Sequence, residues 1–235
     1  YMKNLDGRLQ AAADLVTPGG FLLDVGTDHG YLPIWLMKQG KIRGAIASDV
    51  NLNPLISAKM NIQAAGLSEK IDTRLADGLS GIDLTEVTDI AIAGMGGMLI
   101  GDILEARSPL AGKHLILQPM TQAPYLRRWL CRNGYAISAE SPAEAGGKFY
   151  AVISARYEGS NWECDDFFAH VGKMPDALRS PQKRQLAGQY LKFLQNKLRV
   201  ILLGMSQSAS GDPAAEQYQE IYLQLDELLE REGSL

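Results

Sequence analysis

The segment Asp24–Gly30 (DVGTDHG) joins an apolar run to a helical stretch that begins near Tyr31. Glycine at such a turn lets the backbone approach a bound ligand closely. A dinucleotide site would carry the spacing G-x-G-x-x-G, which this segment lacks. Asp28 also stands where a diphosphate would lie, and its charge favours a cationic ligand over a phosphate. The alternative interpretation is an ordinary turn between a strand and a helix.

Two further acidic residues follow the next two apolar runs. Asp49 lies about 20 residues beyond the glycine segment, where a carboxylate can bind two ribose hydroxyls. Asp77 precedes Gly78 and can accept a hydrogen bond from the exocyclic amine of an adenine. Each could instead be a helix cap or a turn residue. Because parallel strands end at one edge of a sheet, the three acids together predict a nucleoside site there. S-adenosylmethionine, which has a sulfonium cation and no phosphate, fits that site.

A glycine-rich segment, Ala93–Met98 (AGMGGM), follows a fourth apolar run. Glycines weaken regular structure, so several of them beside a buried strand predict a narrow slot where a flat group passes the backbone. Gln118-Pro119 ends a fifth run and is expected to face this slot. Gln118 offers both a donor and an acceptor to a nucleobase edge, or is simply a capped strand end. The Asp/Asn-Pro-Pro-aromatic motif of many amino-methyltransferases is absent from this segment.

Elements with the spacing of an α/β sheet position these residues. We predict buried strands at 21–26, 44–49, 71–75, 88–93 and 113–118, alternating with helices such as one from about Gln122 to Arg132. Two further strands, Tyr135–Ser141 and Phe149–Tyr157, are joined by a loop too short for a crossover and should pair antiparallel. The fold class is therefore α/β: a Rossmann-like, mostly parallel class I methyltransferase sheet that ends in an antiparallel hairpin.

The chain after Tyr157 has a different pattern. Apolar residues recur at helical spacing after Ser180-Pro181 and again after Asp212-Pro213, with Ser206–Gly211 (SQSASG) as a turn between them. We predict a C-terminal helical hairpin, with coiled-coil character, as a subdomain at 159–235, beside a methyltransferase domain at 1–158. The alternative is that these helices only cap the sheet.

Composition sets broader limits. The chain has 235 residues, 46% of them hydrophobic, enough for one core and a small appendage. It shows no signal peptide or membrane-spanning run, so we expect a cytoplasmic protein with no membrane partner. Its two cysteines and three histidines form no metal-binding pattern, and no metal is expected. The net charge of −4 argues weakly against a general polyanion binder, although it can hide a local basic patch.

Several motifs taken together resemble one enzyme family. Asp24–Pro33 (DVGTDHGYLP), Ala93–Gly97 (AGMGG), Leu117-Gln118-Pro119 and Leu5–Leu9 (LDGRL) are similar to those of the bacterial tRNA (adenine-22-N1)-methyltransferases. The resemblance extends over essentially the whole chain. It implies S-adenosylmethionine as methyl donor and the N1 atom of a tRNA adenine as acceptor. The predicted cofactor-binding residues are Asp24, Gly26, Thr27, Asp28, His29, Gly30, Tyr31, Leu32, Asp49, Val50, Asp77, Gly78, Ala93, Gly94, Met95 and Gly96.

The expected mechanism is direct transfer of the methyl group to N1, whose lone pair needs no strong base. Asp28 is predicted to stabilise the positive charge on the product, and Gln118 to hold the exocyclic amine. A tRNA partner requires a basic footprint, which we predict at Arg8, Arg127, Arg128, Arg132, Lys183, Arg184, Lys192 and Lys197. The alternative for these residues is solvated helix faces. The oligomeric state is open, with a monomer favoured.

Two other functions remain compatible with the residues. The first is a class I methyltransferase that acts on a small molecule or a protein. The second is a non-catalytic protein that binds the nucleoside cofactor or RNA.

Overall fold

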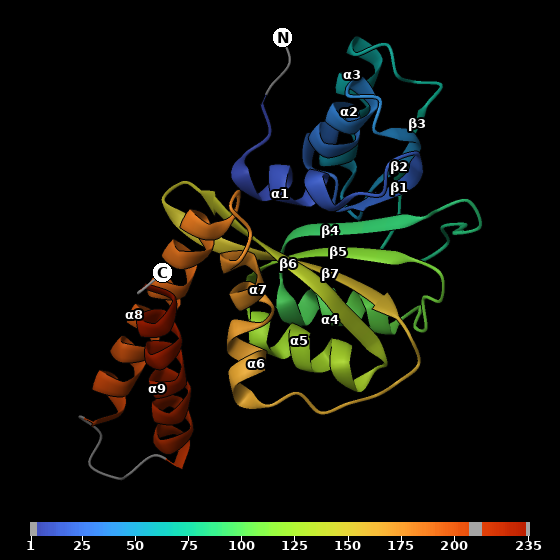
Figure 1. Cartoon of the computed structure of the whole chain (residues 1–235). Coiled ribbons are helices and arrows are strands. Elements are labelled where there is room, and N and C mark those ends of the chain that lie inside the picture. Colours follow the sequence, from blue (N-terminus) through green and yellow to red (C-terminus); the bar gives the residue numbers. More distant parts are fainter. Residues whose placement is uncertain (1–3, 207–212, 234–235) are drawn as a thin grey trace.

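The computed structural model describes residues 4–206 and 213–233, and its centre is a seven-stranded sheet in the order β3-β2-β1-β4-β5-β7-β6 (Figure 1). The strands are β1 (Gly20–Val25), β2 (Ile42–Asp49), β3 (Ile71–Leu75), β4 (Asp89–Gly96), β5 (His114–Thr121), β6 (Tyr135–Ala145) and β7 (Lys148–Tyr157). The first five strands are parallel to one another, while β7 is antiparallel to both β5 and β6. The predicted fold class is confirmed.

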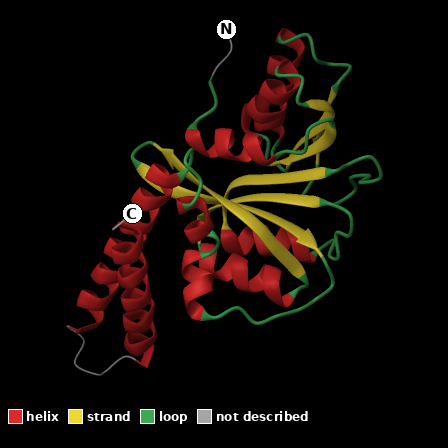
Figure 2. Cartoon of the chain, in the orientation of Figure 1, coloured by secondary structure: helices red, strands yellow, loops and turns green. Residues whose placement is uncertain are grey.

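Helices cover both faces of the sheet, as Figure 2 shows. One face carries α1 (Gly7–Leu15), α2 (Tyr31–Lys38) and α3 (Leu52–Ala64); the other carries α4 (Gly97–Glu105) and α5 (Ala123–Arg132). Apolar residues of the central strands alternate between these two layers, because successive side chains of a strand point to opposite faces. Leu22 thus packs with α1 and α2, whereas Leu23 packs with α4 and α5. This double cover explains the nearly continuous apolar runs in the sequence.

The hairpin of β6 and β7 is longer than predicted. The expected loop at 142–148 is wrong, because Pro142–Ala145 continue β6 and pair with Lys148–Ala151. The turn is only Gly146-Gly147, whose φ angles of 59° and 73° suit the tight hairpin turn that glycine allows. Pro142 has no N–H to donate. It is tolerated in β6 because this strand lies at the edge of the sheet, where one side of the backbone has no neighbouring strand to bond. The predicted antiparallel pairing itself is confirmed.

The C-terminal part contains α6 (Asp166–Val171), α7 (Met174–Leu178), α8 (Arg184–Ser206) and α9 (Pro213–Gly233). The last two helices run antiparallel: Arg184 contacts Glu232, and Gln195 donates a hydrogen bond of 2.7 Å to Asp226. The predicted helical hairpin is present, although α8 begins three residues after the expected Pro181. Most of the turn predicted at Ser206–Gly211 lies outside the described residues.

The helical part is joined closely to the sheet. Ala169 of α6 belongs to the same apolar core as α4 and α5, and α7 and α8 pack against β6. The predicted domain boundary at residue 158 coincides with the end of β7, but the hydrophobic core includes residues on both sides of this boundary. That division into two units stays a prediction.

A buried ion pair fastens this junction. Arg127 of α5 donates two hydrogen bonds of 2.8 Å to Glu140 of β6, and both side chains are fully buried. Arg127 also donates to the carbonyl oxygens of Ala169 and His170 in α6. The prediction that Arg127 binds RNA is wrong, because its guanidinium is enclosed and every direction it offers is occupied by protein acceptors. The nearby charge of Glu140 raises the pKa of Arg127 against the opposing effect of burial.

Glu140→Ala is expected to lower the free energy of unfolding by about 3–5 kcal/mol, because it leaves the Arg127 charge buried without a partner. Equilibrium urea unfolding measures the loss. Glu163→Ala is the matched control. Glu163 pairs at the surface with Arg132, which lies on α5 like Arg127, so its removal should leave the unfolding midpoint nearly unchanged. A Glu140→Ala midpoint equal to that of the control would contradict this account.

Candidate active site

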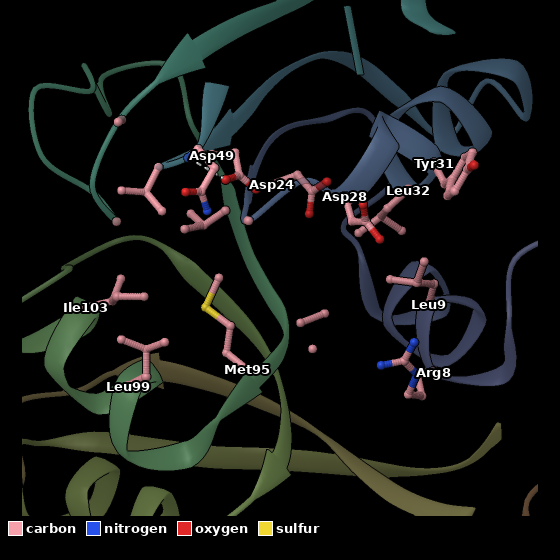
Figure 3. A pocket seen from close by; sticks show the side chains of 18 of the residues that line it. Arg8, Leu9, Asp24, Asp28, Tyr31, Leu32, Asp49, Met95, Leu99 and Ile103 are labelled. Atoms are coloured by element: carbon pink, nitrogen blue, oxygen red, sulfur yellow. Dashed lines mark hydrogen bonds between the residues drawn. The ribbon is translucent and has the colours of Figure 1, made fainter. Parts of the chain in front are cut away.

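A cavity of about 660 Å³ opens at the carboxyl ends of β1, β2 and β4 (Figure 3). The predicted cofactor-binding residues that line it are Asp24, Gly26, Asp28, Tyr31, Leu32, Asp49, Val50, Asp77, Gly78, Ala93, Gly94 and Met95. The other predicted residues, Thr27, His29, Gly30 and Gly96, do not line the cavity. Thr27, His29 and Gly30 lie in the turn after β1, and Gly96 is the last residue of β4. The topology therefore brings the three acidic segments and the glycine-rich segment to one place, as the sequence pattern predicts.

Asp24, the acid at the end of β1, is the most constrained carboxylate of the cavity. It is buried, and the hydroxyl of Thr27 donates a hydrogen bond of 2.5 Å to its Oδ2. Burial raises the pKa of Asp24 to about 6; the Thr27 hydrogen bond opposes this shift, and the nearby charge of Asp49 adds to it. A cationic ligand beside Asp24 would favour its ionised form. Thr27, which the sequence analysis predicts to bind the cofactor, therefore positions this carboxylate in the structure.

The turn after β1 brings backbone close to the cavity. Gly26 has a φ of 72°, and a side chain there would collide with the Met95 side chain on β4. The next residues form one short helical turn in which His29 also has a positive φ, and Asn61 of α3 donates a hydrogen bond to the His29 carbonyl. Asp28 projects from this turn with 81% of its side chain exposed, and its Oδ1 lies 3.2 Å from His29 Nε2. Asp28 thus presents its carboxylate at the cavity rim.

The remaining walls combine acids with apolar surface. The Asp49 carboxylate accepts a hydrogen bond of 2.7 Å from the Asn51 N–H and lies on the same wall as Asp24 (Figure 3). Val50, Leu99 and Ile103 supply apolar side chains around the same space. Carboxylate acceptors beside an apolar slot suit a nucleoside, which has hydroxyl donors on its sugar and a flat base.

Gln118 has a different place from the one predicted. Its side chain is buried: Oε1 accepts a hydrogen bond of 3.0 Å from the Gly94 N–H, and Nε2 donates to the Pro119 carbonyl. Both ends of the amide are occupied by backbone, so the prediction that Gln118 holds a nucleobase is wrong. It instead fixes the backbone at Gly94, one strand away, where β4 departs from regular register with β5.

The sequence pattern assigns Arg8 to the RNA footprint, and the structure shows that its helix, α1, also lines the cavity. Asp6 caps α1 by accepting hydrogen bonds from the N–H groups of Arg8 and Leu9, and its carboxylate also pairs with the Arg8 guanidinium at 2.6 Å. Arg8 and Leu9 then form the cavity wall opposite Met95 and Leu99 (Figure 3). The motif Leu5–Leu9 (LDGRL) was the available signal, because Asp-x-Arg at a helix start combines a cap with a pairing cation.

The other predicted RNA-binding residues are scattered over the surface. Arg128 and Arg132 pair with Asp166 and Glu163, and Lys183 donates a hydrogen bond to Ser141. Arg184, Lys192 and Lys197 are exposed on α8. The structure does not bring all of these side chains into one patch with Arg8, and their contact with RNA stays a prediction.

A second constellation has the spacing of a Ser–His–Asp triad. His114 Nδ1 lies 2.8 Å from Asp89 Oδ1, and its Nε2 lies 2.8 Å from Ser154 Oγ. All three residues are buried at the amino edge of β4 and β5, and none lines either of the two cavities described here. A triad acts on a substrate that reaches its nucleophile. This network instead ties β4, β5 and β7 together.

Comparison with known proteins agrees with this geometry. The profile of a family described as a methyltransferase domain matches residues 5–153. Over 153 residues the chain is 42% identical to the tRNA (adenine(22)-N(1))-methyltransferase of Bacillus subtilis, a stretch that covers 64% of this chain and 64% of that protein. This alignment therefore spans less than two thirds of the relative's length.

The structural comparisons extend over nearly the whole chain. The B. subtilis m1A22 tRNA methyltransferase TrmK is 31% identical, with a TM-score of 0.75 over 99% of both chains. A Streptococcus pneumoniae protein described as a candidate tRNA (m1A22) methyltransferase, solved with S-adenosyl-L-methionine, is 36% identical, with a TM-score of 0.79 over 96% of this chain and 100% of that one. The chain belongs to the methyltransferase family that includes the bacterial tRNA (adenine-22-N1)-methyltransferases.

Proposed function

We propose that this protein transfers a methyl group from S-adenosylmethionine to the N1 atom of an adenine in tRNA, at position 22 as its relatives' names imply. The observation that carries the proposal is the cavity at the carboxyl edge of β1, β2 and β4. It combines acidic residues with an apolar slot, and the segment Asp24–Gly30 lacks the G-x-G-x-x-G spacing of a dinucleotide site. Full-length structural likeness to methyltransferases described as acting on tRNA adenine supports the same substrate.

The residues of the cavity fit this nucleoside. Asp49 offers carboxylate oxygens to the ribose hydroxyls, and Asp77 offers them to the adenine amine. Val50, Leu99 and Ile103 supply apolar surface for the flat base. Asp24 offers a buried carboxylate to the cationic part of the molecule. When bound, S-adenosylmethionine supplies the methyl group, which leaves its sulfur as the bond to the adenine nitrogen forms.

The chain's own groups then have two tasks. The first is to hold the adenine N1 in line for attack, which requires the base to leave any Watson–Crick pair. The second is to stabilise the positive charge that appears on the adenine ring. Asp28, exposed at the rim, provides a carboxylate for this charge. Arg8 faces the same space, but its pairing with Asp6 offsets its own positive charge.

Asp49→Ala is expected to weaken S-adenosylmethionine binding by roughly 1.5–3 kcal/mol, because the ribose hydroxyls lose a charged acceptor. Isothermal titration calorimetry measures the affinity. Asp72→Ala, an exposed aspartate on neighbouring β3 outside the cavity, is the control and should bind like the wild type. Unchanged affinity in Asp49→Ala would remove Asp49 from the site.

Cofactor affinity should also depend on pH through Asp24. The pKa of this carboxyl is raised to about 6, so its stabilising effect on the free fold is present below the ordinary aspartate pKa and is lost as pH rises through about 6. A cationic ligand prefers the ionised form, so affinity should rise about tenfold between pH 5 and pH 7. Calorimetry at several pH values tests this rise.

Asp24→Asn should abolish the rise. Because histidine also ionises in this pH range, His29→Gln is the control and should retain it. A rise that survives in Asp24→Asn would assign the dependence to another group.

Asp28→Asn is expected to bind tRNA and cofactor yet methylate about 10²–10³ times more slowly, because one preorganised charge next to the adenine is lost. The substrate is bulk tRNA from cells that lack this gene, and the product is identified by chromatography and mass spectrometry of the digested nucleosides. We expect 1-methyladenosine. N6-methyladenosine would overturn the acceptor atom, while absence of any tRNA product would favour a small-molecule or protein substrate.

A further inference from the structure

A second cavity, of about 910 Å³, lies between the sheet and the C-terminal helices. We name it the β5–α8 groove. It is formed by the end of β5 and the start of α5 (residues 119–125 and Arg128), by the start of β7 (residues 148–151), by α8 residues that include Phe193 and Lys197, and by His170, Gln217 and Tyr218. Figure 1 shows that these elements meet where the helical hairpin leaves the sheet.

The groove combines aromatic rings with positive charge. Tyr125 and Phe193 are 38% and 41% exposed, so part of each ring is accessible, and Phe193 packs against Phe149 at a ring-centroid distance of 5.8 Å. Lys148 and Lys197 are exposed along the same groove. Among the residues that the structure describes, no aspartate or glutamate lines it. Rings for bases and cations for phosphates are the pairing that binds single-stranded nucleic acid.

This local charge contrasts with the chain as a whole. The net charge is −4, so a polyanion is repelled by most of the surface and attracted where cations gather without acids. An acidic or purely apolar protein partner would use only one of the two features of the groove. An RNA strand uses both.

The groove also adjoins the candidate active site. Arg8 lines the first cavity, and its guanidinium carbon lies 5.7 Å from the centre of the Tyr150 ring. Its Nη1 donates a hydrogen bond of 3.1 Å to Met120 Sδ. Both Tyr150 and Met120 line the groove, so Arg8 lines one cavity and contacts the wall of the other. A strand held in the groove would therefore lie next to the cavity to which the proposed function assigns methyl transfer.

We propose that the unpaired RNA segment next to the target adenine lies in the β5–α8 groove. Its bases stack on Tyr125 and Phe193, and its phosphates contact Lys148 and Lys197. This inference rests on the proposed function, and it narrows the tRNA contact from scattered surface cations to one groove. It also assigns roles to Tyr125, Lys148 and Phe193, which sequence reasoning did not single out.

The electrostatic part is tested by fluorescence anisotropy with the full-length protein and an unmodified tRNA transcript that has adenine at position 22. Lys197→Ala should weaken binding about 3- to 10-fold and reduce the slope of log affinity against log salt by about 0.7–0.9, the effect of one lost phosphate contact. Arg199→Ala is the matched control: it removes an exposed cation of the same helix that does not line the groove, and binding should stay within about twofold. Equal effects of the two variants would overturn the groove.

The stacking part is tested with Phe193→Ala, which should weaken binding of the same transcript about tenfold or more, while Phe193→Tyr retains it. Val200→Ala, an exposed apolar residue of the same helix outside the groove, is the control. Thermal unfolding of each variant checks that the helix packing persists. Unchanged affinity in a folded Phe193→Ala variant contradicts the proposal.

Methylation assays separate the two levels of inference. If the wild type does not methylate the transcript with S-adenosylmethionine, the proposed function is wrong. If the wild type methylates it, but Lys197→Ala and Phe193→Ala bind and methylate it normally, the function stands and the groove is wrong. Cofactor affinity by calorimetry should be the same in all five variants, the two controls included, because none of the four substituted residues lines the first cavity.

Discussion

The parallel pairing of β1 with β2 and β4 is the constraint on which the rest of the structure depends. In this register Asp24 lies between Ala47 and Ala91, and the chains that leave β1, β2 and β4 emerge side by side. Small neighbours leave room for the Asp24 side chain at the strand end. The acidic residues that follow different strands are therefore neighbours in space, and together with α1 they enclose one cavity. An antiparallel arrangement would send alternate segments to the opposite edge.

Buried carboxyl groups at the two edges of this sheet have pKa values shifted in opposite directions. At the amino edge, burial acts to raise the pKa of Asp89, but hydrogen bonds from His114, Thr88 and Thr17 outweigh it and hold that pKa below its ordinary value. At the carboxyl edge, burial raises the pKa of Asp24 to about 6, because the hydrogen bond from the Thr27 hydroxyl does not outweigh burial and the charge of Asp49 adds to the shift. A satisfied carboxylate stabilises the fold, whereas one held at higher energy is ready to interact with a cation. This contrast agrees with a structural role for Asp89 and a binding role for Asp24.

The helical part depends on a different buried charge. Arg127 joins α5, β6 and α6, and burial of Tyr190 from α8 next to it raises the pKa of that phenol. Because Gly172 packs directly against the Arg127 and Glu140 side chains, the chain leaves α6 at one defined place. The position of α8 relative to β5 and β7, and hence the shape of the groove between them, follows from this junction.

Within the described residues, no helix is long and apolar enough to cross a membrane, and no cluster of three potential metal ligands occurs.

Much of this protein was determined by its sequence alone. Apolar periodicity located the strands, because each is buried on both faces, and the acids after successive strands located the cavity, because parallel topology gathers strand ends. What only the tertiary structure decided is the use of individual polar side chains. The side chains of Gln118 and Arg127 could bind a ligand, but their hydrogen-bonding groups are occupied by the Gly94 backbone and the Glu140 carboxylate. The motif Leu5–Leu9 marks the start of α1, but Arg8 reaches the cavity because α1 packs against β6 and β7, which are distant in sequence. A side chain's partners depend on contacts between distant segments, and these are set by packing, whereas strand and helix periodicity is set by near neighbours.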